Sequence, residues 1–274
     1  MNDSRPSSTH PESPGRPLES IISRALAADG TPPFSDGSLI GLANGERETV
    51  WLDDVAAALV SPTEAEFVVD PDARGQGHGA AMLERLLDRG DLLFWAHGDH
   101  PASRALARKH GLEPVRELLQ LRAPVDSSLR GGCTVAFRPG ADESAWLRVN
   151  GRAFAGHPEQ GAVTRAHFES LKSAPWFDAH DLLMLWDDDD LLGFCWLKLE
   201  DGLGEFYVVG VEPALQGQGV GRRLVQEGIA RLAARGITTA HLYVDADNAA
   251  ALRLYRSFGF EQHAIDIQYG RTPR

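Results

Sequence analysis

The sequence predicts an α/β protein built from two similar halves. A glycine-rich segment, Gln216-Gly217-Gln218-Gly219-Val220-Gly221, follows the apolar run 206–211 and precedes an amphipathic stretch with helical spacing. The same order occurs earlier, where Arg74-Gly75-Gln76-Gly77-His78-Gly79 follows the run 64–69. With 274 residues, 43% of them hydrophobic, the chain is long enough for two domains that each bury a core. Two copies of one strand, loop and helix are therefore expected.

The first half is expected at residues 18–125. Residues 1–17 are rich in proline and serine and poor in apolar groups, which predicts a disordered tail. Apolar periodicity predicts helices at 18–28, 77–89 and 103–110, and strands at 49–52, 55–60, 64–69, 92–96 and 115–121. A helix and a Pro/Gly-rich stretch alone precede the first strand, so this half is expected to be abbreviated at its start.

The second half is expected at residues 133–274, after a linker at 126–132 in which serine and paired glycines interrupt both periodicities. Strands are predicted at 133–137, 182–186, 193–199, 205–211 and 238–244, and after residue 260. Helices are predicted at 143–154, 165–172 and 220–235, and a short one begins at the capping pair Asp247-Asn248. Four adjacent acids, Asp187–Asp190, are interpreted as a solvated hairpin turn.

The glycine spacing is typical of a loop that binds a diphosphate. Gly217, Gly219 and Gly221 allow positive φ and a close approach to the backbone, and the helix that follows adds unpaired N–H donors and a partial positive charge. Tight turns and dinucleotide-binding units also produce this spacing. A nicotinamide-binding unit is disfavoured by the late position of each motif and the missing βαβ array. A P-loop is disfavoured because the Gly-Lys-Ser/Thr element is missing.

This order of elements, with a Gln/Arg-x-x-Gly-x-Gly/Ala loop, resembles the acetyl-CoA-binding core of the GNAT acetyltransferases, and the resemblance covers both halves. It implies two tandem domains, each with a mixed sheet, that bind acetyl-CoA through strand and loop. In the second half the implied cofactor contacts are Val209, Gly210, Val211, Gln216, Gly217, Gln218, Gly219, Val220, Gly221, Arg222, Asn248, Ala249, Ala250, Ala251, Leu252 and Arg253. In the first half they are Phe67, Val68, Val69, Gly75, Gln76, Gly77, His78, Gly79 and Ala80.

Acetyl transfer from a thioester to an amine needs a base for the ammonium proton and an acid for the leaving thiolate. The candidates are Glu205, at the start of the strand that leads into the second loop, and Tyr255, to which the resemblance gives the role of acid. Ungapped alignment of the halves sets Thr63 opposite Glu205 and Ala107 opposite Tyr255. It therefore predicts chemistry in the second half alone. The alternatives are a surface carboxylate and a packing ring.

Several strings narrow the resemblance to the mycothiol synthases, a group of tandem GNAT enzymes. These strings are Phe94-Trp95-Ala96-His97-Gly98, His157-Pro158-Glu159-Gln160-Gly161, Phe194-Cys195-Trp196-Leu197-Lys198, the run 204–211 and the run 242–248. The resemblance implies acetylation of the cysteinyl amine of cysteinyl-glucosaminyl-inositol. The implied acceptor contacts are Glu159, Lys198, Glu205, Tyr243 and Asp36, the last at a position where these enzymes usually have a glutamate. Alternatives are acetylation of a protein N-terminus or an aminoglycoside, or a non-enzymatic CoA-binding module.

Composition limits the partners. The net charge of −12 and the absence of a basic stripe argue against nucleic acid or an anionic membrane as partner. Two isolated cysteines, Cys133 and Cys195, favour the cytoplasm over a disulfide-forming compartment, and the histidines lack metal-ligand spacing. Without an apolar run of membrane length, a soluble protein without a metal is expected. A tandem pair can bury its own sheet edges, so a monomer is expected.

Overall fold

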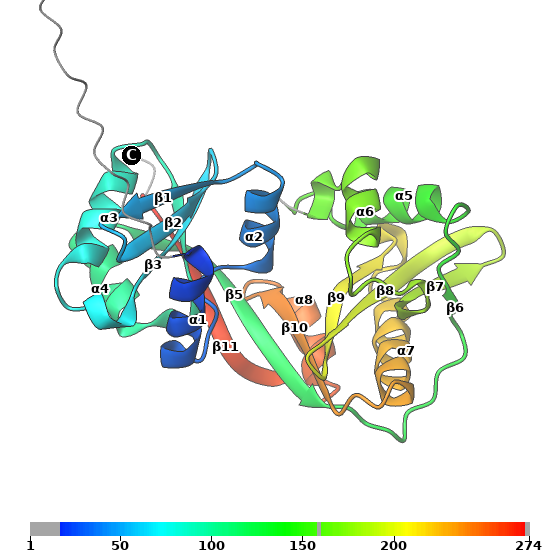
Figure 1. The fold of residues 1–274 in the computed structure, drawn as a ribbon. Coiled ribbons are helices and arrows are strands. Elements are labelled where there is room, and N and C mark those ends of the chain that lie inside the picture. The colour runs from blue at the N-terminus through cyan, green and yellow to red at the C-terminus, as the bar shows by residue number, and fades with distance from the viewer. Residues whose placement is uncertain (1–16, 158–159, 272–274) are drawn as a thin grey trace, which may run out of the picture. The chain divides into compact units, whose positions relative to one another are not determined.

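The structure, a computed structural model, describes residues 17–157 and 160–271. The expected tail lies outside this range except for Pro17. The described residues form two compact units, one made of residues 17–117 and 265–271 and the other of residues 118–157 and 160–264. Figure 1 shows their helices and strands.

The first unit is a mixed sheet between two pairs of helices. Its elements are α1 (Leu18–Asp29), α2 (Asp36–Ala43), β1 (Glu48–Leu52), β2 (Ala56–Val60), β3 (Glu64–Val69), α3 (His78–Leu87), β4 (Leu93–Ala96) and α4 (Pro101–Lys109). Strands β1, β2 and β3 pair antiparallel, and β3 pairs with β4 in parallel. Ala57 and Leu59 pack with α1, whereas Ala56 and Ala58 pack with α3, because successive strand residues face opposite sides of a sheet.

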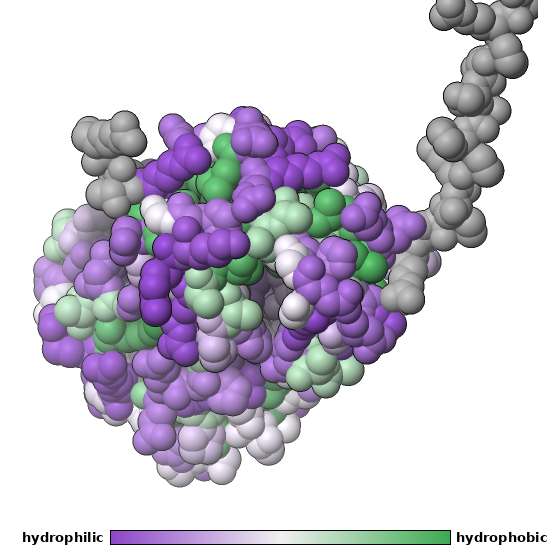
Figure 2. All heavy atoms as spheres, turned by 90° about the vertical axis from the view of Figure 1, so that its left-hand side faces the viewer, coloured by the Kyte–Doolittle hydropathy of each residue, from purple (hydrophilic) through white to green (hydrophobic). Residues whose placement is uncertain are grey.

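Helix α2 was not predicted, because its segment contains Gly37 and Gly41 and follows two prolines. Two contacts compensate for this low helix propensity. Ser35 caps the helix by accepting a hydrogen bond from the Ser38 backbone N–H, and Phe34 packs into the core beside α1. The first unit is therefore less abbreviated than expected. The face of the protein on the side of α3 and α4 is mainly hydrophilic, with small separate apolar patches (Figure 2).

The second unit is also a mixed sheet covered by helices. Its elements are the later part of β5 (Glu113–Pro124), β6 (Val135–Ala136), α5 (Glu143–Ala153), α6 (Arg165–Lys172), β7 (Leu182–Asp187), β8 (Asp190–Glu200), β9 (Leu203–Val211), α7 (Val220–Ala234), β10 (Thr239–Asp245), α8 (Ala249–Arg256) and the start of β11 (Glu261–Gly270). The order is β5-β10-β9-β8-β7-β6, and β9/β10 is the parallel pair. Helices α5 and α7 cover opposite faces of β8 and β9 (Figure 1). The predicted acidic turn joins β7 to β8, where Asp187 pairs with Asp190.

Two long strands give the units different bounds from those expected. Residues 118–124 of β5 pair with β10 and belong to the second unit. Residues Ile267–Tyr269 of β11 pair with β4 and belong to the first unit. The expected linker, 126–132, therefore lies inside the second unit. Its end is tied to α7, because the Glu227 carboxylate accepts hydrogen bonds from the backbone of Gly132 and Cys133.

Within the described residues, no helix is both long and apolar enough to cross a membrane.

Candidate active site

The parallel ladder between β9 and β10 ends where the candidate base lies. Pairing runs from Leu203↔Thr239 to Glu205↔His241, although β9 continues to Val211 and β10 to Asp245. From residue 206 onward, the backbone N–H and C=O groups of β9 that face β10 have no β10 partner in this ladder. An extended ligand can pair with such an open edge.

The glycine loop lies at the other end of β9 and has the geometry expected for an anion site. Gly217 and Gly219 have φ values of 76° and 86°, in the left-handed region that glycine adopts without a Cβ clash. Gly219 is the N-cap of α7, and no side chain caps the helix and no acid lies in its first turn. The first-turn N–H groups and the helix dipole are therefore not neutralised by a capping side chain or an acid.

The third glycine of each loop fits between the helices and the strand. A Cβ on Gly221 would lie 3.3 Å from Leu254 Cδ2 of α8 and 3.8 Å from Val211 Cγ2 of β9. In the first unit, a Cβ on Gly79 would meet Leu106 at 3.1 Å and Val69 at 3.8 Å. The two units thus repeat the same packing, and α8, which carries Asn248–Arg253 at its start, touches the helix that follows the loop.

Glu205 and Lys198 lie side by side on one face of the second sheet. They are a register pair of β8 and β9, so their side chains point to the same face. Lys198 is 8% exposed, its ammonium lies 3.0 Å from Glu200 and 5.7 Å from the ring of Trp176, and Glu205 is half-buried. A carboxylate at the end of the β9/β10 ladder, beside a buried cation, can accept a proton from a bound amine.

Tyr255 lies on the opposite face, toward α7. Its ring is 8% exposed and packs 6.4 Å from Phe206, the residue after Glu205, and 5.7 Å from Phe260. Burial, and next the neighbouring Cys195, raises the pKa of the phenol. Tyr255 therefore stays protonated at neutral pH, as a proton donor must. Two interpretations of Tyr255 fit this position. The ring contacts the core, as a packing residue does, and it adjoins the strand of Glu205, as a catalytic acid would.

The other predicted acceptor contacts are distributed between the units. Tyr243 is 45% exposed on β10, and its hydroxyl accepts a hydrogen bond from Gln120 Nε2 at 2.8 Å. It lies two residues beyond His241 and so shares the face of Glu205. Asp36 is the first residue of α2, in the first unit. Glu159 lies outside the described residues, and His157, two positions before it in the sequence, lies 3.7 Å from Asp245 of β10.

Sequence reasoning missed two residues beside Glu205. His241 is the register partner of Glu205, and Arg122 of β5 is the register partner of His241. Alternation within the predicted strand 238–244 could have placed His241 on the face of Tyr243. Arg122 gave no such signal, because its position depends on the pairing of two strands more than 100 residues apart.

The ungapped comparison of the halves was wrong at this strand. Trp196 pairs with Val208 and Leu197 with Phe206, so Tyr207 is an extra residue in a β-bulge of β9. Strand β3 pairs with β2 without a bulge. Counted through either neighbouring strand, Glu64, not Thr63, is the counterpart of Glu205. A carboxylate is therefore present in both units.

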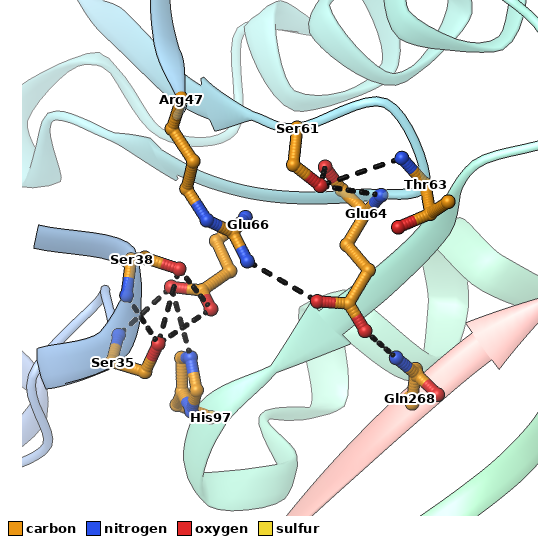
Figure 3. Close-up of polar contacts among 9 residues, drawn as sticks. All are labelled: Ser35, Ser38, Arg47, Ser61, Thr63, Glu64, Glu66, His97 and Gln268. Atoms are coloured by element: carbon orange, nitrogen blue, oxygen red, sulfur yellow. Dashed lines mark hydrogen bonds and ion pairs between the residues drawn. The ribbon is translucent and has the colours of Figure 1, made fainter. Parts of the chain in front are cut away.

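The Glu64 carboxylate of the first unit has two side-chain partners (Figure 3). Glu64 Oε2 lies 3.2 Å from Arg47 Nη2, and Glu64 Oε1 accepts a hydrogen bond from Gln268 Nε2 at 2.7 Å. Ala107, buried in α4, stands at the place of Tyr255. The first loop, Gly75–Ala80, has left-handed glycines at Gly75 and Gly77 like the second, and Phe67, Val68 and Val69 end β3 before it. Arg74, however, donates to both carboxylate oxygens of Asp29, at 2.6 and 2.8 Å.

A buried charged cluster fixes the start of α2 in the first unit (Figure 3). Glu66, 1% exposed, accepts hydrogen bonds from the hydroxyls of Ser35 and Ser38 and from the Ser35 N–H, at 2.7–2.8 Å. His97 lies between Glu66, at 3.4 Å, and Asp266, at 3.1 Å. Burial opposes both charges, but the two carboxylates raise the pKa of His97 to about 10, and His97 with the serines lowers that of Glu66 to about 2. Both groups are charged at neutral pH.

No group of three or more His, Cys, Asp or Glu side chains with metal-site geometry occurs in the part of the chain that the structure describes. The buried cluster at His97 is occupied by its own ion pairs and the serine hydroxyls.

Comparison with known proteins identifies the family. The acetyltransferase (GNAT) family matches residues 153–260. A mycothiol acetyltransferase from Thermomonospora curvata is 42% identical over 93% of this chain and 94% of its own. A GCN5-related N-acetyltransferase from Sphaerobacter thermophilus has a TM-score of 0.66 at 22% identity, covering 92% of this chain and 90% of that one. A tandem GNAT protein from the clavulanic acid biosynthesis pathway has a TM-score of 0.64 at 14% identity, covering 94% and 97%.

These similarities confirm the predicted fold, two tandem GNAT folds with mixed sheets, and an acetyltransferase that uses acetyl-CoA as cosubstrate. The acceptor is a small-molecule amine. The resemblance that the glycine loops and the longer strings indicated is confirmed over almost the whole length, and the chain belongs to the mycothiol acetyltransferase family.

Proposed function

We propose that this enzyme acetylates the cysteinyl amine of cysteinyl-glucosaminyl-inositol, and that its proton transfers occur in the second unit. Similarity to mycothiol acetyltransferases over more than nine-tenths of the chain supports the acceptor. One observation supports the location of the site in the second unit. The ladder between β9 and β10 ends at Glu205, and the glycine loop follows the unpaired part of β9. A single strand thereby connects the proposed base with the proposed diphosphate site.

The cofactor is proposed to lie along the open edge of β9. Backbone groups of Val209, Gly210 and Val211 would pair with the pantetheine arm, and the N–H groups of Gln216–Arg222 would bind the diphosphate. Residues Asn248–Arg253, at the start of α8, would line the other side of the arm. The free first turn of α7 and its two arginines, Arg222 and Arg223, support this assignment.

Each proton has a proposed route. Glu205 takes a proton from the acceptor ammonium, and the freed lone pair attacks the carbonyl carbon of the thioester. When the tetrahedral intermediate collapses, the C–S bond breaks, Tyr255 donates its phenolic proton to the thiolate, and the second proton lost by the attacking nitrogen restores the phenol through solvent. Lys198, Tyr243, Glu159 and Asp36 are proposed to contact the hydroxyls and the amine of the acceptor.

The first unit is proposed to be non-catalytic while keeping CoA affinity or a structural role. Its Glu64 is paired with Arg47, and Ala107 offers no proton. We also propose a cytoplasmic monomer that binds neither nucleic acid nor membranes, which agrees with the net charge of −12.

The test is acetyl transfer by the purified full chain to cysteinyl-glucosaminyl-inositol, a peptide with a free N-terminus and an aminoglycoside. The first acceptor should give the highest kcat/KM. Glu205→Gln and Tyr255→Phe should each lower kcat at least a hundredfold, whereas the controls Glu261→Gln and Tyr269→Phe should not. Preference for the peptide or the drug would refute the proposed acceptor. Binding of acetyl-CoA without turnover of any amine would favour the CoA-binding module.

A further inference from the structure

Four side chains form a continuous row across one face of the second sheet. Lys198 of β8 pairs with Glu205 of β9, Glu205 with His241 of β10, and His241 with Arg122 of β5. Register partners on neighbouring strands point to the same face and lie about 5 Å apart. The row thus extends from the proposed base in both directions, and its β10 and β5 members take no part in the proposed proton transfers.

These two residues carry buried polar atoms that the fold does not satisfy. Within the described residues, neither Nδ1 of His241 nor Nε of Arg122 has a hydrogen-bond partner. Leaving a buried donor or acceptor unpaired costs about 1–3 kcal/mol, so such atoms are normally paired with protein, water or ligand. Buried unpartnered atoms occur elsewhere in the described residues as well, but these two lie on adjacent register positions in the row that contains the proposed base, where a ligand hydroxyl can supply the missing partner.

The electrostatics of the row suit a polar acceptor that carries an ammonium group. Burial, followed by the charges of Arg122, Lys198 and His263, lowers the pKa of His241 to about 4. The imidazole is therefore neutral at pH 7 and offers one accepting and one donating nitrogen. A neutral ring does not repel an ammonium held at Glu205, and the positive charge of Lys198 is balanced by Glu200 at 3.0 Å.

We propose that His241 and Arg122 bind hydroxyl groups of a polyhydroxylated acceptor whose amine lies at Glu205, an inference that rests on the proposed function. A hydroxyl donates to the free ring nitrogen of His241, and the guanidinium of Arg122 donates to a hydroxyl oxygen one strand further from Glu205. The amine-bearing end of the acceptor then lies over β9 and its sugar end over β10 and β5. Strand β5 thereby supplies a specificity residue to the second unit.

The experiment compares two acceptors, cysteinyl-glucosaminyl-inositol and cysteinamide, which has the amine but no hydroxyls. The variants are His241→Phe and Arg122→Met, with His167→Phe on the exposed face of α6 as control. Each test variant should raise KM for the hydroxylated acceptor about tenfold. The KM for cysteinamide, the acetyl-CoA affinity measured by calorimetry and the melting temperature should stay near wild type.

Equal effects on both acceptors, or an unchanged KM for the hydroxylated one, would overturn the inference. Wild-type turnover separates this result from a failure of the proposed function. If the wild-type chain does not acetylate cysteinyl-glucosaminyl-inositol, the proposed function and the inference that rests on it both fall. If it does, the variants alone decide whether His241 and Arg122 recognise its hydroxyls.

Discussion

At the scale of single residues, the partners of a buried or half-buried carboxylate set its environment. Glu64, the counterpart of Glu205, is held by Arg47 and Gln268. Glu66 is buried and charged because His97 and two serines offset its desolvation. The partners of a carboxylate, more than its place in the sequence, decide what it can do.

The Glu66–His97 pair should make stability depend on pH. His97 stabilises the fold fully below its unfolded pKa of about 6.5, and the contribution fades as pH rises toward 10. The contribution of Glu66 is present above about pH 4.5 and fades as pH falls toward 2. His97→Phe should therefore lose roughly 3–5 kcal/mol of unfolding free energy near pH 5.5 and less near pH 9.5. Denaturant titrations at both values check this, and an equal loss at both would contradict it.

Tyr255 makes a second prediction at this scale. Because burial raises the pKa of its phenol, the wild-type kcat should show no alkaline decrease from phenol ionisation up to about pH 9.5. Tyr255→Phe should lower kcat throughout pH 7–9.5 without changing the slope of the profile. A wild-type decrease near pH 9 that disappears in Tyr255→Phe would show that the phenol titrates normally and would count against the burial argument.

At the scale of elements, the loop before α7 depends on left-handed backbone. Gly219→Ala places a Cβ at φ 86°, which should cost about 1–2 kcal/mol and tilt the first-turn N–H groups. We expect the Kd for acetyl-CoA to rise at least tenfold in calorimetry. The matched control is Gly236→Ala, at φ 76° beyond the other end of α7. It should lose similar stability yet keep the wild-type Kd, and equal Kd changes in both variants would assign the effect to stability.

The sequence predicted most elements of the fold but not all of the site. Strong periodicity located α1, α3, α7 and the main strands within a few residues. Helix α2 was not predicted, because its capping and packing contacts come from Ser35 and Phe34, which belong to no helical pattern in the sequence. Arg122 was not predicted as a neighbour of the site, because strand pairing between distant segments leaves no local signal in the sequence. Residue spacing likewise could not reveal the bulge at Tyr207, which changed the counterpart of Glu205.

At the scale of the whole molecule, the compact units do not coincide with the two halves of the sequence. The first half supplies residues 118–124 to the sheet of the second unit, and the C-terminus supplies Ile267–Tyr269 to the sheet of the first. Neither half of the chain therefore contains all the strands of a finished unit.

Cutting the chain at the segment 126–132 tests this arrangement. A fragment of residues 18–125 lacks the β11 partner of β4 and leaves part of β5 unpaired, so it should be unstable and prone to aggregation. Residues 126–274 should behave likewise. Co-expression should restore a soluble complex with acetyltransferase activity, seen as co-elution in size-exclusion chromatography. Two fragments that fold and bind acetyl-CoA separately would contradict the pairing of β5 with β10 and of β11 with β4.

The bulge of β9 has a consequence for how such an enzyme can change over generations. A substitution at Ala107 could give the first unit a phenol, and one at Arg47 could release Glu64. No substitution adds the extra residue that separates Glu205 from its loop, because that requires an inserted codon in β3. If the first unit is non-catalytic as proposed, point substitutions alone would not rebuild in β3 the strand geometry that β9 has around Glu205.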